Sequence, residues 1–367
     1  MVTTIIKAIK AAGGGDYSTL GSWEAARRGN IVTRDTIEIA EIYDATTTGV
    51  GFLPADWTVD ASHYIWIRAA AGYGHLGVFN NTTRASFNGV PWCSVGYVRI
   101  GPGLSIYDVF GTGIKFSNIS TDATCIVDGC IIGAGTPVVR FDNCPVTTNA
   151  NRHVVKNCVI IKRSLGDGAI ATRNGNTKIK VYNCTIRIID EGVSSVTFLP
   201  ETGTDIISEN NYLGSNSRNY FLSWGGTITK GANDATKNTE AITPSLQSIA
   251  YSTANFISVT LGSEDLHILK TGALYNTGAN LTSEGVTTDY EGTTRPQFGD
   301  FDIGAHEFGI PICWNYTARY RGSNKLFKAS GCGPFPKTLQ VPSNVDTSTG
   351  KMIDDGVFIS PDKYEII

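Results

Sequence analysis

Three acidic side chains at four-residue spacing form the best candidate cluster of catalytic carboxylates in the chain. Glu201, Asp205 and Glu209 would point to one face of an extended strand, because side chains alternate along a strand. Two carboxylates that flank a sugar bond can hydrolyse it, one as the acid and the other as the base or nucleophile. The same residues can equally span a loop and the start of a strand as ordinary solvated carboxylates, and we favour that interpretation.

A second set places one carboxylate among basic side chains. The segment GDGAIATRNGNTKIK, residues 166–180, contains Asp167, Arg173, Lys178 and Lys180. A polysaccharide lyase combines acidic metal ligands with a base that removes a proton next to a carboxylate. Asp167 has no second acid at ligand spacing, however, and the composition equally fits a polar turn between strands.

Other features that could bind a metal or a cofactor are weak. Asp354-Asp355-Gly356 lacks the alternating oxygen ligands of a calcium loop and is predicted to be a turn. For His306 a packed structural role is expected. No histidine has a Ser or Cys partner in a recognised nucleophile motif; the five are His63, His75, His153, His267 and His306. The sequence therefore predicts no metal site and no cofactor.

Aromatic residues cluster near residue 220. Tyr212, Tyr220, Phe221 and Trp224 lie within thirteen residues, and aromatic rings can stack on sugars. Burial in the core or at a subunit interface explains such a cluster more often. Tyr220, Phe221 and Trp224 are therefore weak candidates for glycan binding.

These candidates lie in or beside a stretch that repeats a short phrase closed by Asn-Cys or a close variant. The copies are IKFSNIS from Ile114, IVDGCII from Ile126, RFDNCPV from Arg140, VVKNCVI from Val154, KVYNCTI from Lys180 and SENNYLG from Ser208. The residues that follow the Asn, or its substitute Gly129, are Cys130, Cys158, Cys184 and, with Tyr for Cys, Tyr212, in steps of 28, 26 and 28 residues. A fixed period in the twenties with β-branched alternation predicts a stacked β-solenoid, since one unit is too short to bury its own apolar face.

Composition agrees with many short strands and tight turns. The 367 residues include 41 Gly and only 2 Met, and Gly and Asn tolerate the positive φ that tight turns need. We therefore expect little helix. Lys plus Arg number 30 against 33 for Asp plus Glu, so no basic surface for nucleic acid is expected.

The cysteines and the N-terminal sequence bear on the compartment. The eight cysteines contain no CxxC or Cys/His ligand cluster. At equivalent solenoid positions, about 4.8 Å apart, inward cysteines would form a ladder of free thiols rather than disulfides. MVTTIIKAIKAAGGG has no apolar run long enough for a signal peptide or a membrane span. Synthesis in a reducing host cytoplasm, with no membrane partner, is the expectation.

Two phrases mark the ends of the repeated region. Residues 13–26 read GGGDYSTLGSWEAA, in which Ser22 can cap a short helix that carries Trp23. Residues 295–308 read RPQFGDFDIGAHEF. The residues before the first phrase, 1–12, are expected to form an arm, either a short amphipathic helix or an extended segment.

Both phrases resemble those that open and close right-handed parallel β-helix proteins of bacteriophages and bacteria, the pectate-lyase-like solenoids. The resemblance covers about residues 13–308. It implies an all-β chain: a right-handed, single-stranded parallel β-helix over residues 13–309 with a short N-terminal capping helix that plugs the core, and with residues 295–308 closing the last turns. Residues 310–367 are turn-rich with short strand candidates, which predicts a small C-terminal β domain for oligomerisation or attachment.

For function, the resemblance implies two classes. The first is a non-enzymatic phage virion surface protein, a homotrimer that decorates or cements the capsid and binds itself and a capsid or tail protein. The alternative is a tailspike-type polysaccharide-binding protein or depolymerase, a lyase or hydrolase acting on a cell-surface glycan. The absence of a convincing catalytic set in the sequence favours the first.

Overall fold

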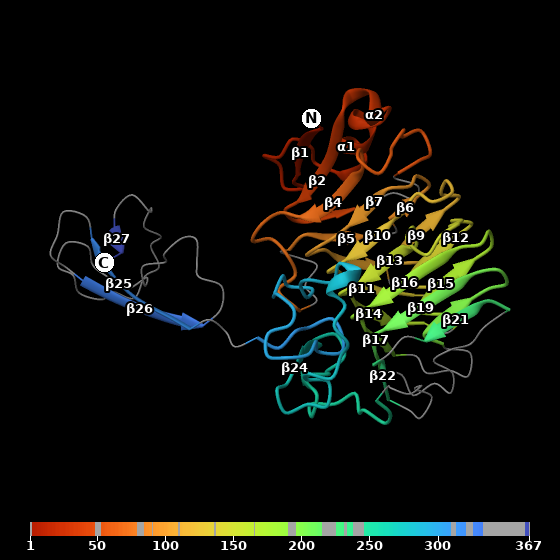
Figure 1. The fold of residues 1–367 in the computed structure, drawn as a ribbon. Coiled ribbons are helices and arrows are strands. Elements are labelled where there is room, and N and C mark those ends of the chain that lie inside the picture. The colour runs from red at the N-terminus through yellow and green to blue at the C-terminus, as the bar shows by residue number, and fades with distance from the viewer. Residues whose placement is uncertain are drawn as a thin grey trace. The chain divides into compact units, whose positions relative to one another are not determined.

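The computed structural model shows a parallel β-helix of about six turns, with short N-terminal helices and a small antiparallel sheet near the C-terminus (Figure 1). The expected fold class is confirmed. The structure describes residues 2–47, 53–78, 84–89, 91–108, 111–135, 137–164, 166–189, 196–214, 225–230, 233–237, 246–309, 313–320, 326–332 and 364–366.

Three parallel sheets run along the solenoid, and a complete turn contributes one strand to each. In the described residues, sheet 1 orders nine strands: β1 (Thr3–Ile9), β2 (Thr36–Ile42), β4 (Ile65–Ala69), β7 (Val98–Ile100), β10 (Ile126–Asp128), β13 (His153–Lys156), β16 (Lys178–Tyr182), β19 (Asp205–Glu209) and β21 (Thr227–Lys230). Sheet 2 orders β3 (Ala45–Thr47), β5 (Ser86–Asn88), β8 (Ser105–Asp108), β11 (Ile131–Ala134), β14 (Val159–Lys162), β17 (Thr185–Ile188), β20 (Tyr212–Leu213) and β22 (Ala235–Thr236). Sheet 3 orders β6 (Trp92–Cys93), β9 (Ile114–Ser117), β12 (Val139–Asp142), β15 (Ile170–Arg173) and β18 (Phe198–Pro200).

Inward side chains stack in columns from turn to turn. In sheet 1, Val127 pairs with Val155, which pairs with Val181 on the next strand, and all three are fully buried. In sheet 3, the rings of Phe116 and Phe141 stack at 4.8 Å between centroids. Because each turn covers the apolar edge of its neighbour, the core is continuous and no turn is stable alone.

Two corners of the solenoid are set by residues in the left-handed conformation. Between sheets 1 and 2 the corner residues Gly129, Asn157, Asn183 and Asn210 have φ of 59°, 52°, 48° and 57°. A second corner, after sheet 3, uses Asn118, Asn143 and Asn174, with φ of 55°, 51° and 54°. Asn and Gly adopt this conformation at the lowest cost among the amino acids. The repeated phrases thus belong to two corners, and those beginning at Ile114 and Arg140 belong to the second.

The inward thiol ladder is confirmed. Cys130, Cys158 and Cys184 each follow a first-corner residue and are fully buried. Their thiols lie 3.4, 3.0 and 3.3 Å from the carbonyl oxygen two residues earlier in the chain. Cys93, Cys125 and Cys144 are also buried and free, and burial raises the pKa of Cys125 to about 12. These thiols act as small apolar side chains with weak S–H donors.

The predicted equivalence of Tyr212 with Cys184 is wrong by one residue. Asn211 occupies the cysteine position, and its Oδ1 accepts a hydrogen bond from the Cys184 amide at 2.8 Å. Tyr212 instead pairs with Thr185 on β17. Its ring therefore points out of the solenoid, where it packs edge-on against Phe256 at 5.1 Å between centroids.

Residues 3–9 take the extended form, one of the two expected for the N-terminal residues, and as strand β1 they join the solenoid. β1 pairs in register with β2 over its whole length. Helix α1 (Leu20–Arg27) is capped by Thr19, which exchanges hydrogen bonds with Ser22 in a capping box, so Ser22 is not the cap itself. Trp23 of α1 is fully buried in the main core. A second short helix, α2 (Ile31–Arg34), follows, and both lie at the end of the solenoid where the chain begins (Figure 1).

Residues 246–308 form a layer outside the solenoid and against sheet 2 (Figure 1). The layer contains the hairpin β23 (Phe256–Ser258) and β24 (Asp265–Ile268) and a 3-10 turn, η1 (Thr282–Glu284). Outward side chains of sheet 2 pack against apolar side chains of the layer; the first group includes Ile131, Val159 and Ile161, and the second includes Phe256, Leu266, Ile268 and Ile303. Sheet 2 is thus covered on both faces.

The phrase at residues 295–308 lies in this layer and does not close the last turn. Arg295, fully buried, donates to the carbonyl oxygens of Asp302, Gly304 and Ala305 and to the Glu307 carboxylate, all at 2.8–3.0 Å. The folded segment then binds the first corner: the Gly304 amide donates to the Asn210 carbonyl at 2.8 Å. The expectation that this phrase covers the open end is therefore wrong, because its bonds fix a loop to the flank.

The chain divides into two compact units, Met1–Phe308 and Gly309–Ile367. In the second unit β25 (Cys313–Tyr320) pairs antiparallel with β26 (Leu326–Cys332) and with β27 (Tyr364–Ile366). The order β26-β25-β27 makes β25 the central strand. This is the small C-terminal sheet expected from the sequence.

The thiol ladder predicts the outcome of thiol titration. In the full-length, unreduced protein, at least six cysteines should react with a thiol reagent only after denaturation, because the six described in the first unit are buried and free. Absorbance titration before and after adding guanidinium chloride measures the difference. Fewer than six additional thiols would contradict the ladder.

The buried Arg295 network predicts a large stability loss. Arg295→Met removes four hydrogen bonds and leaves the buried Glu307 carboxylate without its countercharge, so it should cost about 3–5 kcal/mol in the free energy of unfolding. Arg140→Met breaks a surface pair with Asp142 and should cost less than about 1 kcal/mol. Urea unfolding of both variants compares the two, and equal losses would contradict the role of Arg295.

Candidate functional site

The three acidic candidates do not share a face. Asp205 and Glu209 lie at the two ends of β19 with partly exposed side chains, whereas Glu201 follows β18 of sheet 3. Asp205 forms an ion pair with Arg152, which is almost fully buried. Burial, together with the charge of Glu284, raises the pKa of Glu209. The cluster expected from the spacing is therefore split between two sheets.

The structure instead brings together members of the two separate candidate sets. Arg173 forms ion pairs with Asp167 at 2.5 Å and with Glu201 at 3.0 Å. Lys178 pairs in register with Asp205 on the neighbouring strand, and Lys180 forms an ion pair with Glu284 at 2.6 Å. Because a single guanidinium engages both carboxylates, this arrangement lacks an acid and a base on opposite sides of a substrate bond, as hydrolysis requires.

The remaining sequence candidates give no site. Tyr220, Phe221, Trp224 and the segment Asp354-Asp355-Gly356 lie outside the described residues. Tyr212 is buried, and its hydroxyl donates to the Ile249 carbonyl oxygen at 3.0 Å. It is therefore a packing residue.

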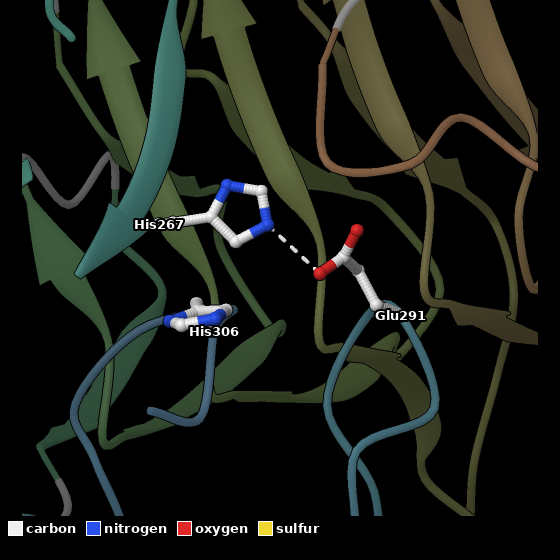
Figure 2. Close-up of side chains that lie close together, drawn as sticks. All are labelled: His267, Glu291 and His306. Atoms are coloured by element: carbon white, nitrogen blue, oxygen red, sulfur yellow. Dashed lines mark hydrogen bonds and ion pairs between the residues drawn. The ribbon is translucent and has the colours of Figure 1, made fainter. Parts of the chain in front are cut away.

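A cluster that sequence reasoning missed lies in the outer layer. Figure 2 shows His267 of β24 pointing toward Glu291, with His306 beside it. His267 Nε2 lies 2.8 Å from a Glu291 carboxylate oxygen, and its Nδ1 bonds the Asp265 carboxylate. The rings of His267 and His306 meet edge-on at 4.6 Å between centroids. Burial alone would lower the pKa of His267, but the two carboxylates outweigh it and raise that pKa to about 9.

Two imidazoles and a carboxylate are ligand types that zinc prefers, and His267, Glu291 and His306 offer atoms within 4.8 Å of one another. The hydrogen bonds of these histidines argue against zinc binding. His306 Nδ1 accepts the amide hydrogen of Ile268 at 3.1 Å, so the proton of the neutral ring is assigned to Nε2, which then has no lone pair for a metal. His267, held between two carboxylates, is instead suited to carry a proton.

The cluster joins the layer to an early turn of the solenoid. Gly77, from the loop after β4, approaches so closely that an added Cβ would lie 2.1 Å from the His267 ring. Tyr290 stacks on His75 at 5.3 Å between centroids, and the His75 Nε2 bonds the carbonyl oxygen of the corner residue Gly129 at 3.0 Å. The geometry favours a structural ion pair at the seam between two parts of the fold.

Sequence spacing offered little signal for this cluster. Asp265 and His267 alternate on one predicted strand, but Glu291 and His306 reach them through turns whose path no short motif encodes. Only the tertiary packing of the layer unites them.

Comparisons of the chain with protein-family models, with curated proteins and with solved structures find no match. No helix among the described residues is long and apolar enough to cross a membrane.

The His267 ion pair predicts a pH-dependent stability. The pKa of His267 is about 9 in the folded chain and about 6.5 in an unfolded chain. The contribution is therefore fully present below pH 6.5 and is lost as the pH rises through about 9. Melting temperatures between pH 6 and 10 should fall more steeply in the wild type than in His267→Gln.

Glu291→Gln is the matched variant, because it removes one carboxylate while leaving the imidazole. It should give an intermediate slope. Identical slopes in all three proteins would contradict the proposed protonation of His267.

Proposed function

We propose that the protein is a non-enzymatic surface protein of a bacteriophage virion, a homotrimer that decorates or cements the capsid. The observation that carries the non-enzymatic part is that three of the four candidate carboxylates are paired with arginines, while the fourth, Glu209, lies at the far end of β19 from Asp205. Asp167 and Glu201 share Arg173, and Asp205 is bound by Arg152. None of these three can act as a free acid or base without first losing a cation.

The architecture supports a role in which shape and rigidity matter. A parallel β-helix with a continuous core and one sheet covered by an additional layer is a rigid scaffold whose surfaces can carry attachment sites. Such a scaffold suits a protein that must stand on a particle surface. The phage assignment itself rests on the resemblance of the two end phrases, residues 13–26 and 295–308.

The second unit supports self-association. In its three-stranded sheet, as far as it is described, β26 and β27 are the outer strands. An outer strand presents backbone donors and acceptors that another chain can pair with. A closed three-fold arrangement would satisfy such edges without forming fibres. The proposed partners are therefore two further copies of the chain and a capsid or tail protein.

The alternative function is a tailspike-type polysaccharide-binding protein or depolymerase. It uses the same scaffold, and it is favoured by the sugar-compatible pocket described in the next subsection. Release of reducing or unsaturated ends from bacterial surface polysaccharide would identify a depolymerase. Antibody labelling of particles from the source culture tests the virion assignment, which fails if intact particles carry no label.

The trimer predicts a defined mass in solution. Light scattering coupled to size-exclusion chromatography should give three times the 39.3 kDa mass of one chain. A chain that ends at Phe308 retains the first compact unit and should shift toward the monomer. A full-length monomer, or a truncated form that stays trimeric, would exclude the role of the second unit.

A further inference from the structure

A pocket of about 310 Å³ lies on the outer face of sheet 1, where β4, β7 and β10 begin. Its lining includes Tyr64, Tyr97, Arg99, Asp122 and Asn151. This volume falls at the lower end of the range of about 300–1,000 Å³ typical of small-molecule sites. The pocket is separate from both the carboxylate candidates and the His267 cluster.

Arg99 is the unusual residue of this pocket. Its neighbours in register are Trp66 on β4 and Ile126 on β10, neither of which is charged. The guanidinium lies over the Tyr64 ring, 3.8 Å from the centroid. Within the part of the chain that the structure describes, its side chain makes no hydrogen bond or ion pair. A stacked guanidinium without an anion presents a planar set of N–H donors that matches a carboxylate.

Neighbouring arginines on the same sheet behave differently. Arg68 on β4 also stacks on an aromatic ring, that of Trp66 at 4.5 Å, but it forms an ion pair with Glu41 at 2.7 Å. Arg152, just before β13, is paired with Asp205. Among the described residues, these two arginines each have an ion-paired carboxylate, whereas the Asp122 carboxylate in the same pocket forms no ion pair with Arg99.

The two tyrosines give the pocket an amphipathic wall. Tyr64 and Tyr97 line it, and neither hydroxyl has a hydrogen-bond partner among the described residues. Tyr97, directly before β7, has a φ of 51°, as Asp35 directly before β2 has a φ of 52°, and its half-buried ring also packs against the main core, which fixes its position beside the pocket. Aromatic rings with free hydroxyls can cover the apolar face of a sugar and bond its hydroxyls at the edge.

A fixed acceptor completes the lining. Both oxygens of Asp122 are engaged by Thr147, one by its amide at 2.7 Å and the other by its hydroxyl at 2.5 Å. These bonds, with a weaker one from Asn151, lower the pKa of Asp122. The pocket thus combines an immobile carboxylate, which accepts from hydroxyl groups, with an unpaired cation.

We propose that this pocket binds one carboxylated sugar unit of an acidic polysaccharide. Arg99 binds the sugar carboxylate, Tyr64 and Tyr97 contact the ring, and Asp122 accepts from ring hydroxyls. A simple anion would bind Arg99 alone and make no contact with either tyrosine. An acidic peptide would supply a carboxylate but no hydroxylated ring for Asp122. The inference requires neither a virion nor a trimer, so it is independent of the virion proposal, and it names the class of sugar for the polysaccharide-binding alternative.

The test compares two probes that differ only at the acidic group. Methyl β-D-glucuronide carries a carboxylate where methyl β-D-glucoside carries a hydroxymethyl group. With the full-length protein, titration followed by saturation-transfer NMR should show the glucuronide binding at least about tenfold more tightly, the size of one charge-assisted hydrogen bond. Arg99→Gln should abolish this preference.

Arg68→Gln is the matched control, since Arg68 lies on the adjacent strand, stacks on an aromatic ring and is already paired. It should leave the glucuronide preference unchanged. Tyr64→Leu, whose fold is checked by its melting temperature, should weaken both sugars. Tyr64→Leu should weaken binding even if Arg99 keeps its position, because the sugar ring loses an aromatic surface.

Four results would overturn the proposal. The glucuronide preference could survive in Arg99→Gln, or neither sugar could bind. Acetate could compete as strongly as the glucuronide, which would make this a general anion site. Triglutamate could compete more strongly than the glucuronide, which would reassign the pocket to acidic peptides.

Discussion

The stacking of this solenoid depends on a backbone constraint at its corners. Each turn must change direction between sheets 1 and 2 within one residue, and that residue must take positive φ. Gly129, Asn157, Asn183 and Asn210 meet the requirement in succession. A β-branched residue there would be strained, and the turn could not place the following cysteine inward. The Asn-Cys phrase therefore meets two structural requirements: Asn forms the left-handed corner, and Cys provides the small buried side chain that follows it.

The corner also anchors the outer layer, which explains why a motif resembling an end phrase lies on the flank. The Asn183 side chain donates to the Asp302 carbonyl at 3.0 Å, and the Thr185 hydroxyl accepts from the Ala305 amide at 3.0 Å. Arg295 and Glu307 keep this segment folded although both are buried. Burying such charges is costly unless they are paired and hydrogen-bonded. Here four acceptors bind one guanidinium, so the motif is a structural device without chemistry of its own.

The fold could be predicted from the sequence because its determinants are local and repeated. Period, β-branched alternation and Asn-Cys phrases predicted the solenoid, and the position of Trp23 predicted the plug. Three details failed for physical reasons. Asn211 occupies the place given to Tyr212, because Asn210 and not Asn211 takes the left-handed corner, and the Asn211 side chain then caps the Cys184 amide. Residues 3–9 are extended, as one of the two expected forms, but their pairing with β2 was not foreseen because it depends on a strand about thirty residues later in the chain. Glu201 does not share a strand with Asp205 and Glu209, because a corner separates it from β19.

Sites on the outer faces could not be predicted in the same way, because they join residues that are close only across turns. Arg173 meets Glu201 from the next turn of sheet 3, and Arg99 meets Tyr64 from the preceding turn of sheet 1. In a solenoid, the neighbours of an outward side chain on the adjacent strands lie about one period away in the sequence. Whether its charge finds a partner therefore depends on residues some thirty positions distant. At Arg173 the next turn supplies Glu201 and the loop just before β15 supplies Asp167, so both carboxylates that pair with this cation come from the fold itself. At Arg99 the flanking turns supply Trp66 and Ile126, and the cation remains available to a ligand. The same repeat that makes the scaffold predictable thus lets single outward positions acquire binding function without any change in the core.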